Sequence, residues 1–197
     1  MDIDINLSEC LACGHSINGY DFETNTMMSS KPGKWKFKAC TNCSHVNLVN
    51  RVPLNDLHEY YDENYLPYRG ANAWGKYASF VENDQVKLDQ RRVALVQKYT
   101  QSNHRVLDVG CGKPTFLKTL SQHHSSKCIG IDFSDHGWSD NATFDELDLR
   151  VGEINSLSNT DKVDLVTMWH YLEHDYDPFA TLSQVKNLLN NNGYIVI

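Results

Sequence analysis

Two short cysteine pairs constrain the folding of the N-terminal part of this chain more than any other feature. They are Cys10 with Cys13 and Cys40 with Cys43. Each CxxC turn directs two sulfurs at one metal ion, and two such turns complete a tetrahedral Cys₄ shell, the usual structural zinc site. The four cysteines are therefore the expected ligands of one Zn²⁺. A closed shell leaves no open position for chemistry, so we expect the metal to be structural.

The surroundings of the cysteine pairs favour a small zinc-ribbon-like module over residues 1–52. Alternating apolar and charged residues predict a strand over Trp35–Ala39, and Val46–Val49 is the next expected strand. So short a segment has little core of its own, and the metal is expected to supply part of its folding energy. We interpret the neighbouring His15 and His45 as residues outside the metal shell.

Charge and targeting signals limit the partners of the chain. Its net charge is −7, which makes nucleic acid an unlikely partner because phosphate binding needs a basic surface. No apolar stretch approaches the ~20 residues of a membrane-spanning helix. The acidic start of the sequence lacks the basic region of a secretion signal. The sequence thus predicts a cytoplasmic protein without a membrane partner, where paired cysteines favour metal over disulfides. One local basic run is interpreted as a solvated hairpin face: Lys31, Lys34, Lys36 and Lys38.

Residues 53–100 are expected to form a helical, tyrosine-rich connector. Its aromatic residues are interpreted as core residues, and a lid formed by the tyrosine-rich loop (Tyr61, Tyr65, Tyr68 and Trp74) stays open as the alternative. Apolar residues at helical spacing predict a short helix over Leu54–Tyr61 and a longer one over Lys76–Tyr99. The apolar positions that indicate the second helix are Tyr77, Phe80, Val81, Leu88, Val93, Leu95 and Val96.

From residue 101 to 197, short apolar strands alternate with helices. This alternation predicts an α/β domain with a Rossmann-like, doubly wound and mainly parallel sheet. Ligands of such sheets bind at the carboxyl ends of the strands. The expected strands are Arg105–Val109, Cys128–Ile131, Leu147–Val151, Val163–Met168 and Tyr194–Ile197; the helices are Thr115–Gln122 and Asp177–Leu189, and Asn190–Gly193 is a turn.

A glycine turn follows the first of these strands. Gly110 and Gly112 allow a ligand to approach the backbone closely. Asp132 stands 22 residues after Gly110, at the end of the second strand. That is the spacing of an acidic residue that accepts hydrogen bonds from both ribose hydroxyls of an adenosine-bearing cofactor.

Four segments resemble class I S-adenosylmethionine-dependent methyltransferases. Residues 108–112, Asp-Val-Gly-Cys-Gly, resemble their motif I, although Pro114 replaces the third glycine. Residues 163–174, completed by Asp177 and Pro178, resemble their fourth-strand motif, and residues 188–197 resemble the entry to their fifth strand. Residues 60–65 resemble the connector of members that carry an N-terminal Cys₄ zinc module. The nearest subgroup methylates small molecules, sugars among them.

The resemblance implies S-adenosylmethionine as cofactor and assigns roles by position. Asp108 and the glycine turn would hold the methionine end, Asp132 the ribose, and Glu153 the adenine amino group. Trp169 and His170 would lie near the sulfonium. The expected cofactor-binding residues are Asp108, Gly110, Cys111, Gly112, Asp132, Phe133, Glu153 and Trp169.

Methyl transfer to a hydroxyl or an acidic carbon requires a base. His170 and His174 are the candidates, with Glu173 as an orienting or alternative group, which makes these three the expected catalytic residues. The expected acceptor is a small molecule. Two alternatives stay open: RNA methylation with the zinc module contacting RNA, and an inactive protein that only binds its cofactor or a partner.

The resembled fold continues beyond strand five, which predicts a sheet that is incomplete at its C-terminal edge. Residues 194–197 end the sequence with three apolar side chains in a row after Tyr194. An uncovered edge of this kind favours pairing with another chain. We therefore expect self-association through this edge.

Overall fold

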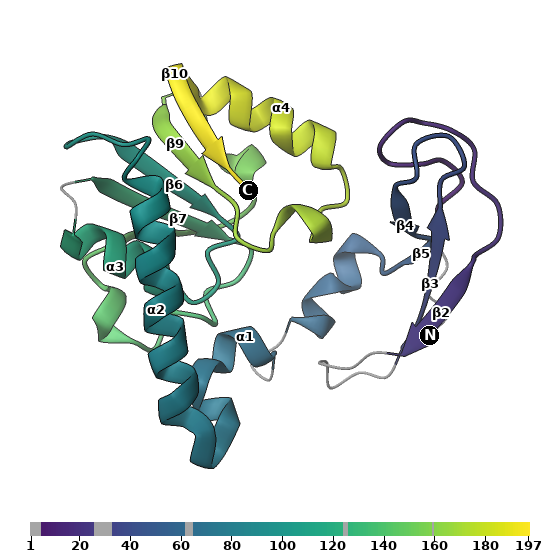
Figure 1. The fold of residues 1–197 in the computed structure, drawn as a ribbon. Coiled ribbons are helices and arrows are strands. Elements are labelled where there is room, and N and C mark those ends of the chain that lie inside the picture. Colours follow the sequence, from purple (N-terminus) through teal and green to yellow (C-terminus); the bar gives the residue numbers. More distant parts are fainter. Residues whose placement is uncertain (1–4, 26–32, 62–64, 124–125, 159) are drawn as a thin grey trace. The chain divides into compact units, whose positions relative to one another are not determined.

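The computed structural model describes residues 5–25, 33–61, 65–123, 126–158 and 160–197 (Figure 1). The chain forms two compact units, Met1–Leu66 and Pro67–Ile197. Within the described ranges, no helix combines the length and the apolar character needed to cross a membrane. Lys31, part of the basic run, lies outside these ranges.

The first unit is built from short antiparallel strands. Strand β3 (Lys34–Ala39) lies between β2 (Phe22–Asn25) and β4 (Val46–Leu48). Its alternation places Phe37 against Phe22, with ring centroids 5.0 Å apart. The two strands expected from the sequence are confirmed to within a residue at each end. A second pair joins β1 (Ile5–Asn6) to β5 (Asn50–Arg51), and a 3₁₀ helix, η1 (Leu54–Tyr60), follows.

The second unit contains a five-stranded parallel sheet. Its strands are β6 (Arg105–Val109), β7 (Lys127–Asp132), β8 (Asp148–Val151), β9 (Val163–Thr167) and β10 (Leu189–Val196), in the order β10-β9-β6-β7-β8. All neighbouring pairs are parallel. The strand order reverses at β6, and in such sheets the ligand crevice lies at this reversal. The Rossmann-like parallel sheet expected from the sequence is confirmed.

Helices cover both faces of this sheet (Figure 1). On one face, α2 (Ala78–Val96) and α3 (Thr115–His123) share a core that includes Val96, Leu120 and Leu165. On the other, α4 (Pro178–Leu188) packs with Leu107 and Ile154. The remaining helices are short: α1 (Leu66–Arg69), η2 (Gly70–Tyr77), η3 (Ala142–Phe144), η4 (Ile154–Ser156) and η5 (Leu172–His174).

Helix α2 buries its apolar side only near its C-terminal end. Val93 and Val96 are buried, whereas Phe80 is 65% exposed and Leu88 is 40% exposed. The expected helix is therefore confirmed, but the apolar pattern of its first half does not contribute to the core.

The expected turn at Asn190–Gly193 is wrong as a boundary, because β10 includes these residues. Leu189 pairs with Val163 and Tyr194 pairs with Leu165, so the register shifts between the two pairs. The polar run forms a bulge within the strand, held by Asn190 Nδ2, which donates to Asp164 Oδ1 at 2.7 Å. Pairing with β9 on both sides of the bulge overrides the local turn signal.

Strand β10 lies at one edge of the sheet. Its side chains Tyr194 and Ile195 are 48% and 38% exposed. Self-association through this edge stays a prediction.

Candidate functional site

The four paired cysteines come together at one point of the first unit. Their sulfur atoms all lie within 4.8 Å of one another. Cys10 Sγ is 3.7 Å from Cys43 Sγ, and Cys13 Sγ is 3.6 Å from Cys40 Sγ. A tetrahedral Zn²⁺ with bonds of about 2.3 Å requires sulfurs about 3.8 Å apart. The cluster thus has the ligand type, number and spacing of a structural zinc site.

The two CxxC turns have the same backbone arrangement. The N–H of Gly14 donates to the carbonyl of Cys10 at 2.8 Å, and Ser44 does the same to Cys40 at 2.9 Å. Both residues adopt left-handed backbone, with φ of 68° at Gly14 and 64° at Ser44. Buried Asn47 follows the second turn in the sequence and contacts the first one. Its Oδ1 accepts a hydrogen bond from Leu11 N at 3.0 Å, and its Nδ2 lies 3.5 Å from Cys10 Sγ.

Ser44 is expected to be less favourable than glycine at its position. Left-handed backbone costs an L-residue about 1–2 kcal/mol, partly offset by the flexibility of glycine when unfolded. Ser44→Gly should therefore raise the free energy of unfolding of this unit by about 0.5–1 kcal/mol. Denaturant titration of the metal-loaded chain measures it. Gly14→Ala, at the equivalent position, should lower stability; effects of the same sign would contradict this explanation.

The glycine turn follows the carboxyl end of β6 and lies against the carboxyl end of β7. Gly110 and Gly112 have φ of 69° and 49°, a region that favours glycine. The N–H of Gly110 donates to the carbonyl of Ile131 at 2.8 Å. The N–H of Gly112 donates to Asp132 Oδ2 at 2.9 Å. The sequence-predicted turn and acidic residue are thus in direct contact.

Asp132 is buried at the end of β7 and accepts several hydrogen bonds. Besides Gly112, the N–H of Ser134 lies 3.2 Å from Oδ1 and the hydroxyl of Tyr68 lies 3.4 Å from the same oxygen. Burial raises the pKa of Asp132, and these donors oppose the rise. The carboxylate is preorganised by backbone groups at the crevice.

Asp108, at the end of β6, faces the α2 side of the sheet. Thr167 Oγ1 donates to Asp108 Oδ1 at 2.7 Å. Complete burial raises the pKa of Asp108 to about 7, although Thr167 and the charge of Arg92 act against the rise. Arg92 itself pairs with Asp89 at 3.7 Å.

Trp169 packs beside Arg92. The guanidinium of Arg92 lies 4.7 Å from the centre of the Trp169 ring, and Phe116 contacts the ring edge-on at 5.4 Å. Within the described residues, the buried Nε1 of Trp169 has no hydrogen-bond partner. An unused donor beside a cation, near the glycine turn, suits an anionic group of a ligand.

The other expected cofactor residues lie at neighbouring strand ends. Phe133 follows β7 and is 39% exposed, and Glu153 is exposed at the start of η4. Cys111 differs, because its thiol is buried and burial raises its pKa. Its sulfur lies 2.9 Å from where a Cβ on Gly130 would stand, so this glycine is needed for the packing. Cys111 therefore contributes its backbone and its volume.

The expected catalytic residues follow β9. His170 Nδ1 lies 3.5 Å from Glu173 Oε1, and both side chains are exposed. His170 has a φ of 57°, a conformation uncommon for residues other than glycine. His174 is exposed one turn further on. The structure thus brings His170 and Glu173 together, in an arrangement where a carboxylate orients an imidazole.

Three residues near the crevice were missed from the sequence. Tyr68 contacts Asp132, and the Tyr171 ring lies against Gly110, where a Cβ would be 2.3 Å from Tyr171 Cδ2. Arg92 is the third. The sequence contains a signal only for Arg92. Asp89 and Arg92 stand three residues apart on the same helix, next to Val93 and Val96, whose side chains are buried, so a charged pair is expected at the edge of the core. Tyr68 belongs to the tyrosine-rich loop for which the sequence left a lid open as the alternative, and Tyr171 belongs to the fourth-strand motif, but neither pattern assigns a contact to the individual tyrosine.

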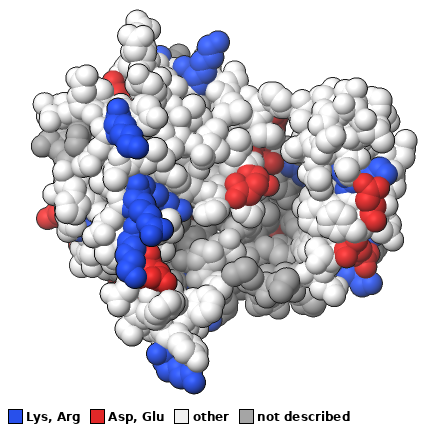
Figure 2. Space-filling view, viewed as in Figure 1, with Lys and Arg blue, Asp and Glu red and all other residues white. Residues whose placement is uncertain are grey.

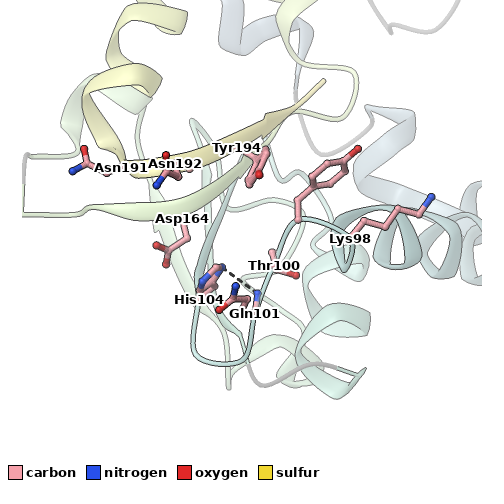
Figure 3. Close-up of a pocket in the computed structure, with 10 residues that line it drawn as sticks. Lys98, Thr100, Gln101, His104, Asp164, Asn191, Asn192 and Tyr194 are labelled. Carbon is pink, nitrogen blue, oxygen red and sulfur yellow. Dashed lines mark hydrogen bonds between the residues drawn. The ribbon is translucent and has the colours of Figure 1, made fainter.

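A separate cavity of about 340 Å³ lies at the opposite, amino-terminal end of the sheet (Figure 3). Two of the polar side chains that line it have partners within the chain. Asp164 Oδ2 accepts from Arg105 N at 2.8 Å, and His104 Nδ1 accepts from Gln101 N at 3.1 Å. Tyr99 and Tyr194 contact each other beside it. The cavity is remote from the glycine turn, and the proposed chemistry does not use it.

The parallel sheet, with its glycine turn at the strand reversal and the carboxylate of Asp132 beside it, defines a Rossmann-like domain. A family model described as a methyltransferase domain matches residues 80–197. The chain belongs to this methyltransferase domain family. No curated protein sequence matches the chain.

Solved structures similar to this chain include several methyltransferases. An S-adenosylmethionine-dependent methyltransferase from Archaeoglobus fulgidus has 26% identity and a TM-score of 0.48, covering 56% of this chain and 51% of its own. One from Geobacter sulfurreducens, in complex with S-adenosyl-L-homocysteine, has 19% identity and a TM-score of 0.46, covering 54% and 45%. A TehB-like enzyme from Corynebacterium glutamicum has 19% identity and a TM-score of 0.43, covering 52% and 59%. The chain spans about half the length of these proteins.

Proposed function

We propose that the chain is an S-adenosylmethionine-dependent methyltransferase with a small-molecule acceptor and a structural zinc site. The observation that carries the proposal is the contact between Gly112 and buried Asp132 at the strand reversal of a methyltransferase domain. A backbone-oriented carboxylate beside a glycine turn suits the two hydroxyls of a ribose.

The remaining groups of the crevice complement the rest of the cofactor. Phe133 provides an exposed apolar ring and Glu153 an exposed acceptor for an adenine amino group. At the other end, Asp108 complements an ammonium group. Arg92 complements a carboxylate, with Trp169 Nε1 as a further donor. The order of these groups, from β8 across β7 to β6, matches the order adenine, ribose and methionine.

The cofactor supplies a methyl group on a sulfonium, a carbon already activated for displacement. The protein then has to position the acceptor and accept its proton. We assign the base to His170, oriented by Glu173 at 3.5 Å, with His174 as the alternative. The exposure of His170 gives it access to an acceptor and to solvent, where it can release the proton. The strained φ of His170 is consistent with a residue held in place for function.

Charge compensation in the first unit favours a small acceptor over RNA. Lys34 pairs with Glu23 at 3.0 Å, and Lys38 pairs with Asp21 at 2.6 Å. The face shown in Figure 2 carries small groups of basic and acidic side chains separated by uncharged surface. A phosphate backbone requires a more continuous basic surface.

Pro114 does not argue for an inactive protein. It immediately precedes α3, and its carbonyl accepts from Lys118 N at 3.0 Å. The first N–H groups of a helix have no partner within the helix, so a proline here removes no helical hydrogen bond. The departure from the third motif glycine is accommodated by the start of α3.

Binding of S-adenosylmethionine to the Asp132→Ala variant tests the proposal. Loss of hydrogen bonds to a charged group costs about 1.5–3 kcal/mol, so affinity should fall about tenfold to a hundredfold. Isothermal titration calorimetry measures it. Asp140→Ala, the same change at an exposed position of the same unit, should bind like the unsubstituted chain. Equal affinity of a folded Asp132→Ala variant would place the cofactor elsewhere.

A further inference from the structure

Both acceptor positions of Asp132 Oδ1 are occupied in this structure. An ionised carboxylate offers about four acceptor positions. The backbone N–H of Gly112 occupies one position on Oδ2, and the backbone N–H of Ser134 occupies one on Oδ1. The hydroxyl of Tyr68 is the remaining donor, at 3.4 Å from Oδ1. A ribose hydroxyl can bind to Oδ1 only if one of the two donors to this oxygen leaves.

Tyr68 is the donor that can leave. The other two belong to the backbone of the glycine turn and of the segment after β7, so they are fixed by the fold. Tyr68 reaches Asp132 from the short helix α1, by a side chain. Its distance of 3.4 Å is longer than the usual 2.7–2.8 Å between two oxygens, so the bond is weak.

Two more contacts hold the segment around Tyr68 against the glycine turn. The Tyr68 ring lies over Gly112, where a Cβ would be 4.0 Å from Tyr68 Cε1. Lys113 lies against Gly70, with its Nζ 3.0 Å from the corresponding Cβ position. Tyr68 is only 8% exposed as a result. Tyr68 and Gly70 thus lie against the turn from a part of the chain upstream of the family match at 80–197.

We propose that Tyr68 competes with the cofactor for Asp132, so that residues 66–77 cover the free site and must move away when the ribose binds. This inference rests on the proposed function. The phenol hydroxyl substitutes for a ribose hydroxyl on the same oxygen, and the ring shields the glycine turn from water. The access of the cofactor is then controlled by a segment outside the methyltransferase domain proper.

Calorimetry with S-adenosylhomocysteine tests the competition. Tyr68→Phe keeps the ring and removes the hydroxyl, so the dissociation constant should fall about threefold to tenfold, in the range of one weak hydrogen bond. Tyr77→Phe, at a residue 58% exposed in the same segment, is the matched control and should bind like the unsubstituted chain. Unchanged or weaker binding by Tyr68→Phe would overturn the proposal.

Amide hydrogen exchange gives a second and independent measurement. Without any ligand, Tyr68→Phe should exchange faster than the unsubstituted chain over residues 66–77, and Tyr77→Phe should not. Addition of S-adenosylhomocysteine should speed exchange over 66–77 while slowing it over 108–112. Slower exchange over 66–77 would show that the segment closes on the cofactor and would overturn the proposal.

The two measurements separate this inference from the proposed function. If neither chain binds S-adenosylhomocysteine, the proposed cofactor is wrong, and the ligand-free exchange still decides whether Tyr68 holds the segment. Equal exchange in the ligand-free chains overturns the inference even where the cofactor binds.

Discussion

Replacing Cys40 with serine is expected to unfold the first unit and to abolish its zinc binding. The apolar core of this unit is small, and one of its clusters consists of Cys10, Ile17 and Cys40 with Leu7 packed against it. Metal binding to such sites contributes about 10–16 kcal/mol in isolated zinc-finger peptides, more than the stability of a small domain. The second unit has its own sheet and cores and should stay folded.

Metal analysis and NMR spectroscopy measure this prediction. The unsubstituted chain should contain one zinc, and Cys40→Ser should contain none and lose the dispersed signals of residues 5–61. His45→Ala is the control, because His45 is adjacent to the cluster but is not among the four sulfur ligands. A Cys40→Ser variant that keeps stoichiometric zinc and native signals would show that the four cysteines are not the ligand set.

The Asp108→Asn variant is expected to be more stable than the unsubstituted chain above neutral pH. The folded pKa of Asp108 is raised to about 7 by burial, from an ordinary value of 3.8. Between pH 3.8 and about 7, Asp108 is therefore protonated in the folded state and ionised in the unfolded state. The contribution of the protonated carboxyl to the free energy of unfolding is fully present below about pH 4 and is lost as the pH rises through about 7.

The size of this effect follows from the pKa difference. A pKa difference of one corresponds to about 1.4 kcal/mol in the free energy of unfolding. The free energy of unfolding of the variant should therefore exceed that of the unsubstituted chain by on the order of 2–4 kcal/mol at pH 8, and by little at pH 4. Asparagine can retain the hydrogen bond with Thr167. Urea unfolding between pH 4 and 8, with Asp140→Asn as the control, measures it. Parallel pH profiles of Asp108→Asn and the unsubstituted chain would contradict the assignment.

The sequence predicts those parts of the molecule in which short-range patterns determine the structure. Alternation identifies β3, strand-helix spacing identifies the parallel sheet, and the spacing of Gly110 and Asp132 brings a turn and a carboxylate to one edge. The metal ligands are predicted in the same way, because each CxxC motif brings two cysteine sulfurs together within four residues.

Contacts between segments far apart in the sequence could not be predicted in this way. Tyr68 and Asp132 are 64 residues apart, and no local pattern relates them. Phe80 follows the same helical pattern as Val96, and only the extent of the sheet decides that one is exposed and the other buried. The bulge in β10 is similar, because three consecutive asparagines predict a turn unless a neighbouring strand continues to pair.

The bulge has a consequence for the solubility of the sheet edge. Exposed edge strands promote aggregation when they are long, straight and apolar. In β10, residues 190–193 interrupt the regular register and place polar side chains along the first half of the edge. Only Tyr194, Ile195 and Val196 pair in continuous register with β9. An incoming strand would therefore meet the regular spacing of a parallel strand at these three residues and not along the polar run before them.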